Sequence, residues 1–162
     1  MLHENPDWYA PLGAAFDAAE VPHEQWLLTG GMLDLDDVPA AGVFWSRMSA
    51  SSHTRWHPYA KDQARAVLSW LESHGRRVVN GRRALELEVS KAAQLAALRA
   101  AGFEFIETAD GRMVTYDVNT TTNYSAQIEA VAPRPALAEV AAFLGRLLAE
   151  ESSAQRSGRR SG

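Results

Sequence analysis

Apolar residues recur three and four positions apart in several parts of the chain, which is the spacing of one face of an α-helix. The pattern predicts four helices, over residues 8–20, 59–74, 89–101 and 136–151. The second helix is followed by Gly75, a residue type that commonly ends helices. Helices with one apolar face cover a shared core, so a layered globular fold is expected.

Short apolar runs between these helices predict strands. They lie at residues 1–4, 21–28, 42–45 and 77–80. Over residues 1–102 the order is therefore strand, helix, two strands, helix, strand and helix. This alternation favours an α/β fold, with a small, mostly parallel sheet and helices on its faces.

The pattern changes to period two over residues 103–108 and 113–118, on either side of Asp110-Gly111. Asp-Gly between two alternating runs is a strong signal for a β-hairpin. A two-residue turn at this dipeptide pairs Glu104 with Asp117 and places Asn119 on the same face.

Two carboxylates opposite each other repel, and a hard divalent cation bound to carboxylate and amide oxygens relieves that repulsion. The hairpin therefore predicts a metal site with Glu104, Asp117 and Asn119 as ligands. The alternative is an exposed hairpin face on which the two acids simply face water.

A polar segment, residues 46–55, follows the predicted strand at 42–45 and precedes the helix at 59–74. Ligands commonly bind at the carboxyl ends of strands in α/β proteins. Within this segment, residues 49–55 are rich in hydroxyl and guanidinium groups, which suit an anion or a carboxylate. A polar loop without a ligand is equally compatible. His53 and His57 are spaced for a metal on a helix, but Pro58 favours a loop role for both.

The composition narrows the possible classes of protein. The 162 residues are 46% hydrophobic and 22% charged, as in an ordinary globular domain. The net charge is −4 and the basic residues form no stripe, so we expect no nucleic-acid partner. Cysteine is absent, no apolar run approaches membrane-spanning length, and no signal peptide is evident. We therefore expect a cytoplasmic protein without a membrane partner.

Two groups of motifs resemble one known family, the RimK-like ATP-grasp proteins of the alpha-L-glutamate ligase group. The most specific motifs are Arg-Met-Ser-Ala-Ser-Ser-His-Thr-Arg at 47–55 and Tyr-Asp-Val-Asn at 116–119. Supporting motifs include Glu-Asn-Pro-Asp-Trp at 4–8, Glu-Val-Ser-Lys at 88–91 and Phe-Glu-Phe-Ile at 103–106. Together the similar segments span most of residues 1–150.

The resemblance implies a set of site residues and cofactors. Glu104, Asp117 and Asn119 correspond to ligands of Mg²⁺, or of Mn²⁺, at an ATP site, and Lys91 corresponds to a lysine that approaches nucleotide phosphate. A substrate-contacting loop is implied, with Arg47, Ser51, Ser52, His53 and Arg55. Family members join a carboxylate to an amine through an acylphosphate made with ATP, and magnesium neutralises the developing charge.

The chain also departs from the family. The predicted helix that ends near Gly102 runs directly into Phe103, where family members carry a large nucleotide-binding region. The resemblance thus implies an N-terminal pre-ATP-grasp-like α/β domain at 1–102 and a remnant of the ATP-grasp C-terminal subdomain, a hairpin and helix, at 103–151. Residues 152–162 are rich in Ser, Gly and Arg and are predicted to be a disordered tail.

The expected function is that of an internally shortened carboxylate–amine ligase with reduced or no ligase activity of its own. No catalytic residue is assigned, and ATP binding is implied only by the family. The alternative is a non-enzymatic module that binds a small molecule or peptide carboxylate, a metal, a second copy or a full-length relative. A chain without a selected function is a third alternative.

Overall fold

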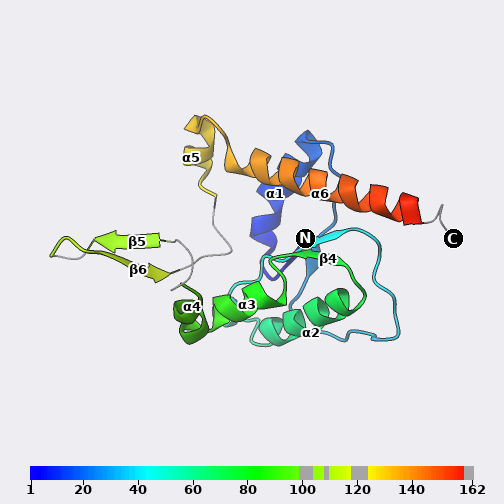
Figure 1. The fold of residues 1–162 in the computed structure, drawn as a ribbon, viewed down its shortest axis with the longest axis horizontal. Helices are drawn as coiled ribbons and strands as arrows, with labels where there is room; N and C mark the ends of the chain where they lie inside the picture. The colour runs from blue at the N-terminus through cyan, green and yellow to red at the C-terminus, as the bar shows by residue number, and fades with distance from the viewer. Residues whose placement is uncertain (99–103, 108–109, 118–123, 159–162) are drawn as a thin grey trace.

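The computed structural model describes residues 1–98, 104–107, 110–117 and 124–158 and has a mixed α/β fold (Figure 1). Four short strands form the centre of the molecule: β1 (Leu2–His3), β2 (Trp26–Leu27), β3 (Val43–Trp45) and β4 (Arg77–Val79). The described helices are α1 (Tyr9–Ala18), α2 (Ala60–Ser73), α3 (Arg82–Val89), α4 (Lys91–Leu98), α5 (Ala126–Val131) and α6 (Ala136–Gly158). Two 3₁₀ turns, η1 (Pro6–Trp8) and η2 (Ser52–Arg55), complete the N-terminal part.

The central strands are parallel, as the alternation of strands and helices predicts. β1 pairs with β2 and β3 pairs with β4, each pair in parallel. A single parallel bridge between Leu2 and Ser46 joins the two pairs, and the Arg47 N–H donates to the Leu2 carbonyl oxygen at 2.8 Å. The strands therefore lie in the order β2-β1-β3-β4, with all four carboxyl ends at one edge.

Helices cover both faces of these strands, and each face has its own apolar core. One core packs beneath α2 and α3; its buried residues include Leu2, Leu28, Met48, Ala64, Leu68, Leu71 and Leu85. The other lies between the strands and the α1–α6 pair; its buried residues are Leu12, Phe16, Trp45, Ala141, Leu144 and Leu147. In Figure 1, α1 and α6 lie on one side of β4, and α2 and α3 lie on the other.

Contact between α6 and the N-terminal segment is close. A Cβ atom built on Gly145 would lie 2.9 Å from Cγ2 of Val21, nearer than carbon atoms normally approach. The glycine therefore lets α6 settle against the residues that follow α1. The last helix of the chain and the first helix share one core, so sequence segments far apart make one packed body.

Two helices of the structure were not predicted. α3 occupies residues 82–89, where only the charges preceding the next helix were recognised, and an extended Ser90 separates it from α4. α3 is fixed by tertiary contacts: Leu85 is buried, and Glu86 accepts a hydrogen bond from the Arg65 Nε of α2 at 2.6 Å. The second, α5, is a six-residue helix after Ser125 and is too short for periodicity to reveal.

The hairpin is present, with β5 (Glu104–Glu107) antiparallel to β6 (Met113–Asp117). Glu104 pairs with Asp117, as predicted. The register then shifts between Glu104 and Phe105, so Phe105 pairs with Thr115 and the predicted pairing with Tyr116 is wrong. An extra residue on one strand, as in a β-bulge, produces such a shift. The pair forms a sheet of its own and projects away from the body (Figure 1).

The C-terminal helix is longer than predicted. α6 continues beyond Glu151 to Gly158, so residues 152–158, for which we predicted disorder, are helical. Hydrogen bonds within the helix explain the continuation, because Ser153 Oγ donates to the Ala149 carbonyl oxygen at 2.9 Å and Arg156 donates to Ser153 Oγ at 3.1 Å. Within the described part of the chain, no helix combines the length and apolarity needed to cross a membrane.

Candidate functional site

Polar side chains gather where β1 and β3 end. Glu4 directly follows β1, and Ser46 and Arg47 directly follow β3. Because these strands are parallel and neighbouring, their carboxyl ends deliver the following residues to one place. The turn η2 adds Arg55, which contacts Glu4. Ser52 is buried three residues earlier on the same 3₁₀ turn, a spacing that places both side chains on one side of the turn. These four side chains, Glu4, Arg47, Ser52 and Arg55, are called the arginine cluster below.

A buried ion pair lies at the centre of the arginine cluster. The Glu4 side chain is 0% exposed and accepts a hydrogen bond from the Arg55 guanidinium group, whose side chain is 29% exposed. Arg55 also donates to Ser51 Oγ at 3.4 Å. Burial of a carboxylate is costly unless a cation compensates it, and Arg55 supplies that compensation while reaching the surface itself.

Arg47 is held by aromatic rings. It is buried, and its guanidinium carbon lies 5.5 Å from the centre of the Trp8 ring and 5.4 Å from that of Trp45. The centre of the ring of Tyr124, which precedes α5, also lies 5.4 Å from the Arg47 guanidinium carbon. The Arg55 guanidinium also lies over Trp8, at 5.0 Å. Contacts of this length are favourable cation–π interactions.

The electrostatics of the cluster follow from this burial. Loss of hydration lowers the pKa of Arg47, and the nearby Tyr124 and Glu4 oppose that change. An arginine remains charged under these conditions, since its ordinary pKa exceeds 12. Two guanidinium groups and one carboxylate are thus concentrated beside the Trp8 ring.

Several polar atoms of the cluster are buried and have no hydrogen-bond partner among the described residues. They are Oε2 of Glu4, Oγ of Ser52 and Nε of Arg55. Buried polar groups are nearly always hydrogen-bonded in native proteins, and each exception calls for an explanation. The three atoms comprise an acceptor, a hydroxyl that can donate or accept, and a cationic donor. Such a set is suited to a small polar ligand.

His3 lies beside the cluster and is also buried. Its Nδ1 is 2.8 Å from the Asn5 carbonyl oxygen, and its ring stacks on Tyr9 with 5.8 Å between ring centres. Burial lowers the pKa of His3, although the Asn5 carbonyl and the Gln25 side chain partly offset this effect. The neutral imidazole is therefore the favoured form at neutral pH.

The structure brings together three of the five residues predicted for a substrate-contacting loop. Arg47, Ser52 and Arg55 meet in the arginine cluster. Ser51 is exposed and contributes only its Oγ, 2.8 Å from that of Ser49. His53 is exposed on η2 and takes no part in the cluster.

Glu4, Trp8 and Tyr124 were not predicted as site residues. Glu4 could have been found from the sequence, because it is the last residue of a predicted strand and strand carboxyl ends commonly hold ligands. Trp8 and Tyr124 carried no comparable signal. They reach Arg47 only because the fold brings η1 and the segment before α5 to the end of β3.

The residues that we predicted to bind a metal and a nucleotide phosphate are distant in sequence from those of the arginine cluster. Glu104 and Asp117 are paired in the hairpin, whereas Asn119 falls outside the described residues. Among the described residues, no three His, Asp or Glu side chains gather as metal ligands would. Lys91 is exposed at the start of α4, where its Nζ donates to Gln94 Oε1 at 3.0 Å. The metal and phosphate roles therefore stay predictions.

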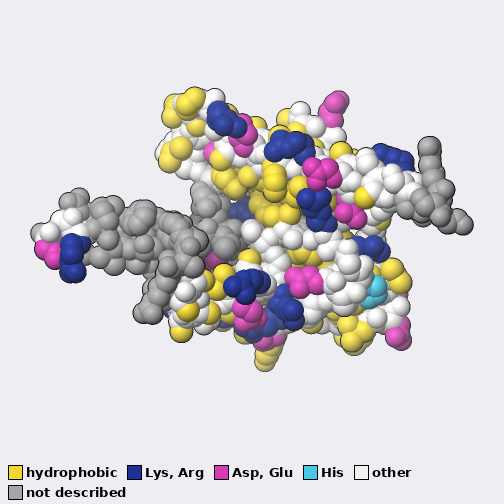
Figure 2. Space-filling model, in the orientation of Figure 1, with side chains coloured by type: hydrophobic (Ala, Val, Ile, Leu, Met, Phe, Trp, Pro, Cys, Tyr) yellow, Lys and Arg dark blue, Asp and Glu magenta, His cyan; other side chains and the backbone are white. Residues whose placement is uncertain are grey.

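The visible surface has a mixed charge. Figure 2 shows Lys and Arg side chains interspersed with Asp and Glu side chains, without a continuous basic stripe on that face. No protein-family model, curated protein or solved structure matches the chain. The arginine cluster is therefore the feature on which a function can be based.

Proposed function

We propose that the protein binds a small molecule or peptide carboxylate at the arginine cluster, and that it does not complete an ATP-dependent ligation alone. The observation that carries this proposal is a pair of buried donors at the carboxyl edge of the parallel strands, Arg55 Nε and Ser52 Oγ, for which the described part of the chain supplies no hydrogen-bond partner. A carboxylate offers two acceptor oxygens and one negative charge, which match these donors and the guanidinium groups beside them.

The half-exposed position of Arg55 gives the ligand a route to these donors. Its side chain is 29% exposed whereas that of Glu4 is fully buried, so a ligand would reach the cluster from the side of Arg55. The resemblance of residues 47–55 to the substrate-contacting loop of RimK-like ligases supports the same type of ligand. A carboxylate-binding module is thus favoured over a nucleic-acid or membrane protein.

Direct binding measurements test the proposal. Glutarate, a short acidic peptide and glutaramide, the uncharged diamide of glutarate, are titrated into the protein by calorimetry. We expect the carboxylate ligands to bind, and Ser52→Ala and Arg55→Lys to weaken binding about tenfold, because each removes a donor. Arg82→Lys, an exposed arginine on α3, is the matched control.

The same variants separate a ligand site from a purely structural network. Ser52→Ala should weaken binding without lowering stability, since the hydroxyl has no partner to lose. Equal affinity for glutarate and glutaramide, or unchanged affinity in both variants, would show that the cluster only stabilises the fold. ADP release in the presence of magnesium, glutamate and an amine is measured in parallel, and amine-dependent turnover would refute the second half of the proposal.

We also propose a weak divalent cation site on the hairpin. The pairing of Glu104 with Asp117 supports it, since directly opposed carboxylates repel and a cation relieves the repulsion. If Asn119 supplies a third oxygen, the ligand set suits Mg²⁺ or Mn²⁺. A metal-dependent shift of the unfolding temperature tests this site, with the variant described in the Discussion.

A further inference from the structure

A cavity of about 1000 Å³ lies at the opposite edge of the parallel strands, where they begin. It is bounded by the first residues of β1, by Gln25 and Trp26 at the start of β2, and by Val43 and Phe44 of β3. Ligand pockets in proteins usually have volumes of about 300–1,000 Å³, so this cavity can hold a molecule of drug-like size.

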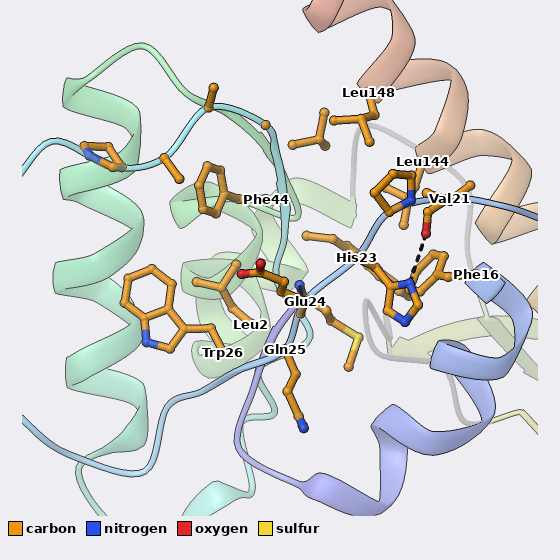
Figure 3. Close-up of a pocket in the computed structure, with 18 of the residues that line it drawn as sticks. Leu2, Phe16, Val21, His23, Glu24, Gln25, Trp26, Phe44, Leu144 and Leu148 are labelled. Carbon is orange, nitrogen blue, oxygen red and sulfur yellow. Dashed lines mark hydrogen bonds between the residues drawn. The ribbon is translucent and has the colours of Figure 1, made fainter.

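The walls of the cavity are apolar and largely aromatic. Figure 3 shows Trp26 and Phe44 on one side and Phe16 and Leu144 on the other. Trp26 meets Trp70 edge to face, with 6.3 Å between ring centres. Phe16 meets Trp45 in the same way, also at 6.3 Å. The rings are therefore held in place by each other, and they present a preformed surface to an apolar ligand.

The charged side chains that line the cavity are acidic. Glu24 and Asp37 are part of the lining, and the described lining residues include neither lysine nor arginine. Figure 3 places Glu24 between the two aromatic walls. His23 is turned to the Val21 carbonyl oxygen, 2.9 Å from its Nδ1. An acidic group among aromatic rings favours a positively charged ligand, because the faces of the rings also attract cations.

The Met1 amino group also lies beside Glu24 in the cavity lining. It donates to the Glu24 carbonyl oxygen at 2.6 Å, and burial lowers its pKa to about 6. At neutral pH this amine is therefore mostly uncharged and leaves the negative charge of the Glu24 carboxylate in place.

From the cavity, its aromatic walls and its acidic residues, we propose that the protein binds a small organic amine with an aromatic or bulky apolar body at this edge. The body fills the space between Trp26, Phe44 and Phe16, and the ammonium group lies at Glu24. This site is separate from the arginine cluster, which lies at the other edge of the strands and is suited to an anion. Neither proposal depends on the other.

Three probes of similar size and different charge test the site: phenethylamine, 2-phenylethanol and phenylacetate. Binding is followed by tryptophan fluorescence and by calorimetry, since Trp26, Trp45 and Trp70 line the cavity. We expect the amine to bind most tightly, the alcohol about fivefold more weakly, and the acid most weakly. Equal affinities, tighter binding of the acid, or no binding at millimolar concentration would overturn the proposal.

Three substitutions test whether the amine binds in this cavity. Glu24→Gln should reduce the affinity for phenethylamine to that for the alcohol and leave the alcohol unaffected. Asp36→Asn removes a neighbouring acid that does not line the cavity, and it should change nothing. Ala41→Trp fills the cavity from an exposed lining position and should abolish binding of the amine and the alcohol. Amine binding that survives both Glu24→Gln and Ala41→Trp would place the ligand elsewhere and refute this site.

Discussion

The two edges of the parallel strands differ in whether their charged side chains are buried and paired or exposed. At the carboxyl edge, Glu4 is buried and bound to Arg55, and Arg47 is buried among aromatic rings. At the amino edge, Glu24 is exposed beside a cavity with aromatic walls. The carboxyl edge thus depends on its charges for stability, whereas the amino edge can change its charge without affecting the fold. Four predictions test this difference, in order of decreasing effect.

The largest effect is expected for Glu4→Gln. The substitution keeps the shape of the side chain but leaves the buried Arg55 end without its carboxylate partner. Loss of one member of a buried ion pair costs about 3–5 kcal/mol, and the partial exposure of Arg55 places this loss near the lower value, about 3 kcal/mol. Urea denaturation measures the change in the free energy of unfolding.

Glu24→Gln is the matched control at the amino edge. It removes the same charge from an exposed glutamate, so the free energy of unfolding should stay within experimental error of the wild type. A comparable loss in both variants would show that the two edges do not differ in the way described.

A smaller effect of opposite sign is expected for Ser52→Ala. The hydroxyl is buried without a hydrogen-bond partner, and removal of such a group restores part of its desolvation cost. The variant should therefore be about 1 kcal/mol more stable than the wild type, as measured by urea denaturation. A loss of 1 kcal/mol or more would mean that this hydroxyl is already satisfied in the native protein.

The third prediction concerns acid pH. His3 has a folded-state pKa below its ordinary value of 6.5, so the unfolded chain binds a proton more readily than the folded chain. Stability should therefore fall as the pH decreases below 6.5, and this contribution should level off below the folded-state pKa. His3→Gln removes the contribution, so the difference in unfolding free energy between wild type and variant should depend on pH in this window. A constant difference from pH 7.5 to 5 would contradict the assignment.

The smallest effect is expected at the hairpin. Asp117→Asn removes one of two opposed carboxylates and should raise the stability of the metal-free protein by a few tenths of a kcal/mol. It should also remove the increase in unfolding temperature that millimolar manganese or magnesium produces in the wild type. Thermal unfolding with and without metal measures both changes. Absence of any metal-dependent shift in the wild type would leave the hairpin as a solvated acidic face.

The parts of the fold that follow from local patterns could be predicted. α2 carries apolar residues at helical spacing and ends at Gly75, whose φ of +65° suits glycine, and its boundaries are correct within a residue or two. The parallel order of β1 to β4 follows from the alternation of strands and helices. α3 could not be predicted in this way, because its eight residues hold a single fully buried leucine and depend on contacts with α2.

The register of the hairpin shows a similar limit. A hairpin around Asp110-Gly111 and the pairing of Glu104 with Asp117 were predicted correctly. The register of a two-residue turn was wrong, because the pairs from Phe105 to Glu107 are shifted by one residue. A bulge depends on the geometry of both strands and leaves no mark in an alternating pattern. The continuation of α6 to Gly158 does not follow from composition, because Ser and Gly are poor helix formers on average, whereas side-chain hydrogen bonds are made within this helix.

Only part of the candidate site could be predicted, namely the residues in the polar segment that follows β3. A polar run after a buried strand indicated Ser52 and Arg55, since residue type and position agreed, whereas Arg47 was indicated by the family resemblance. The partners of these residues come from elsewhere in the sequence: Glu4 from the first strand and Tyr124 from the segment before α5. Pairings over such separations are set by the tertiary fold, and no local pattern contains them. The cavity at the amino edge has the same origin and was not predicted at all.

The shared core of α1 and α6 has a consequence for how the chain is made. During synthesis, Leu12, Phe16 and Trp45 emerge early but gain their partners Ala141, Leu144 and Leu147 only when α6 follows, several seconds later at about 5–20 residues per second. Until then the nascent chain exposes an apolar face that a chaperone can bind.

Once closed, the body holds both ends of the segment between Leu98 and Tyr124, so this segment can lengthen at little entropic cost, about 0.6 kcal/mol for each doubling of its length. The junction is therefore a place where evolution can insert or delete a whole lobe while the body stays the same.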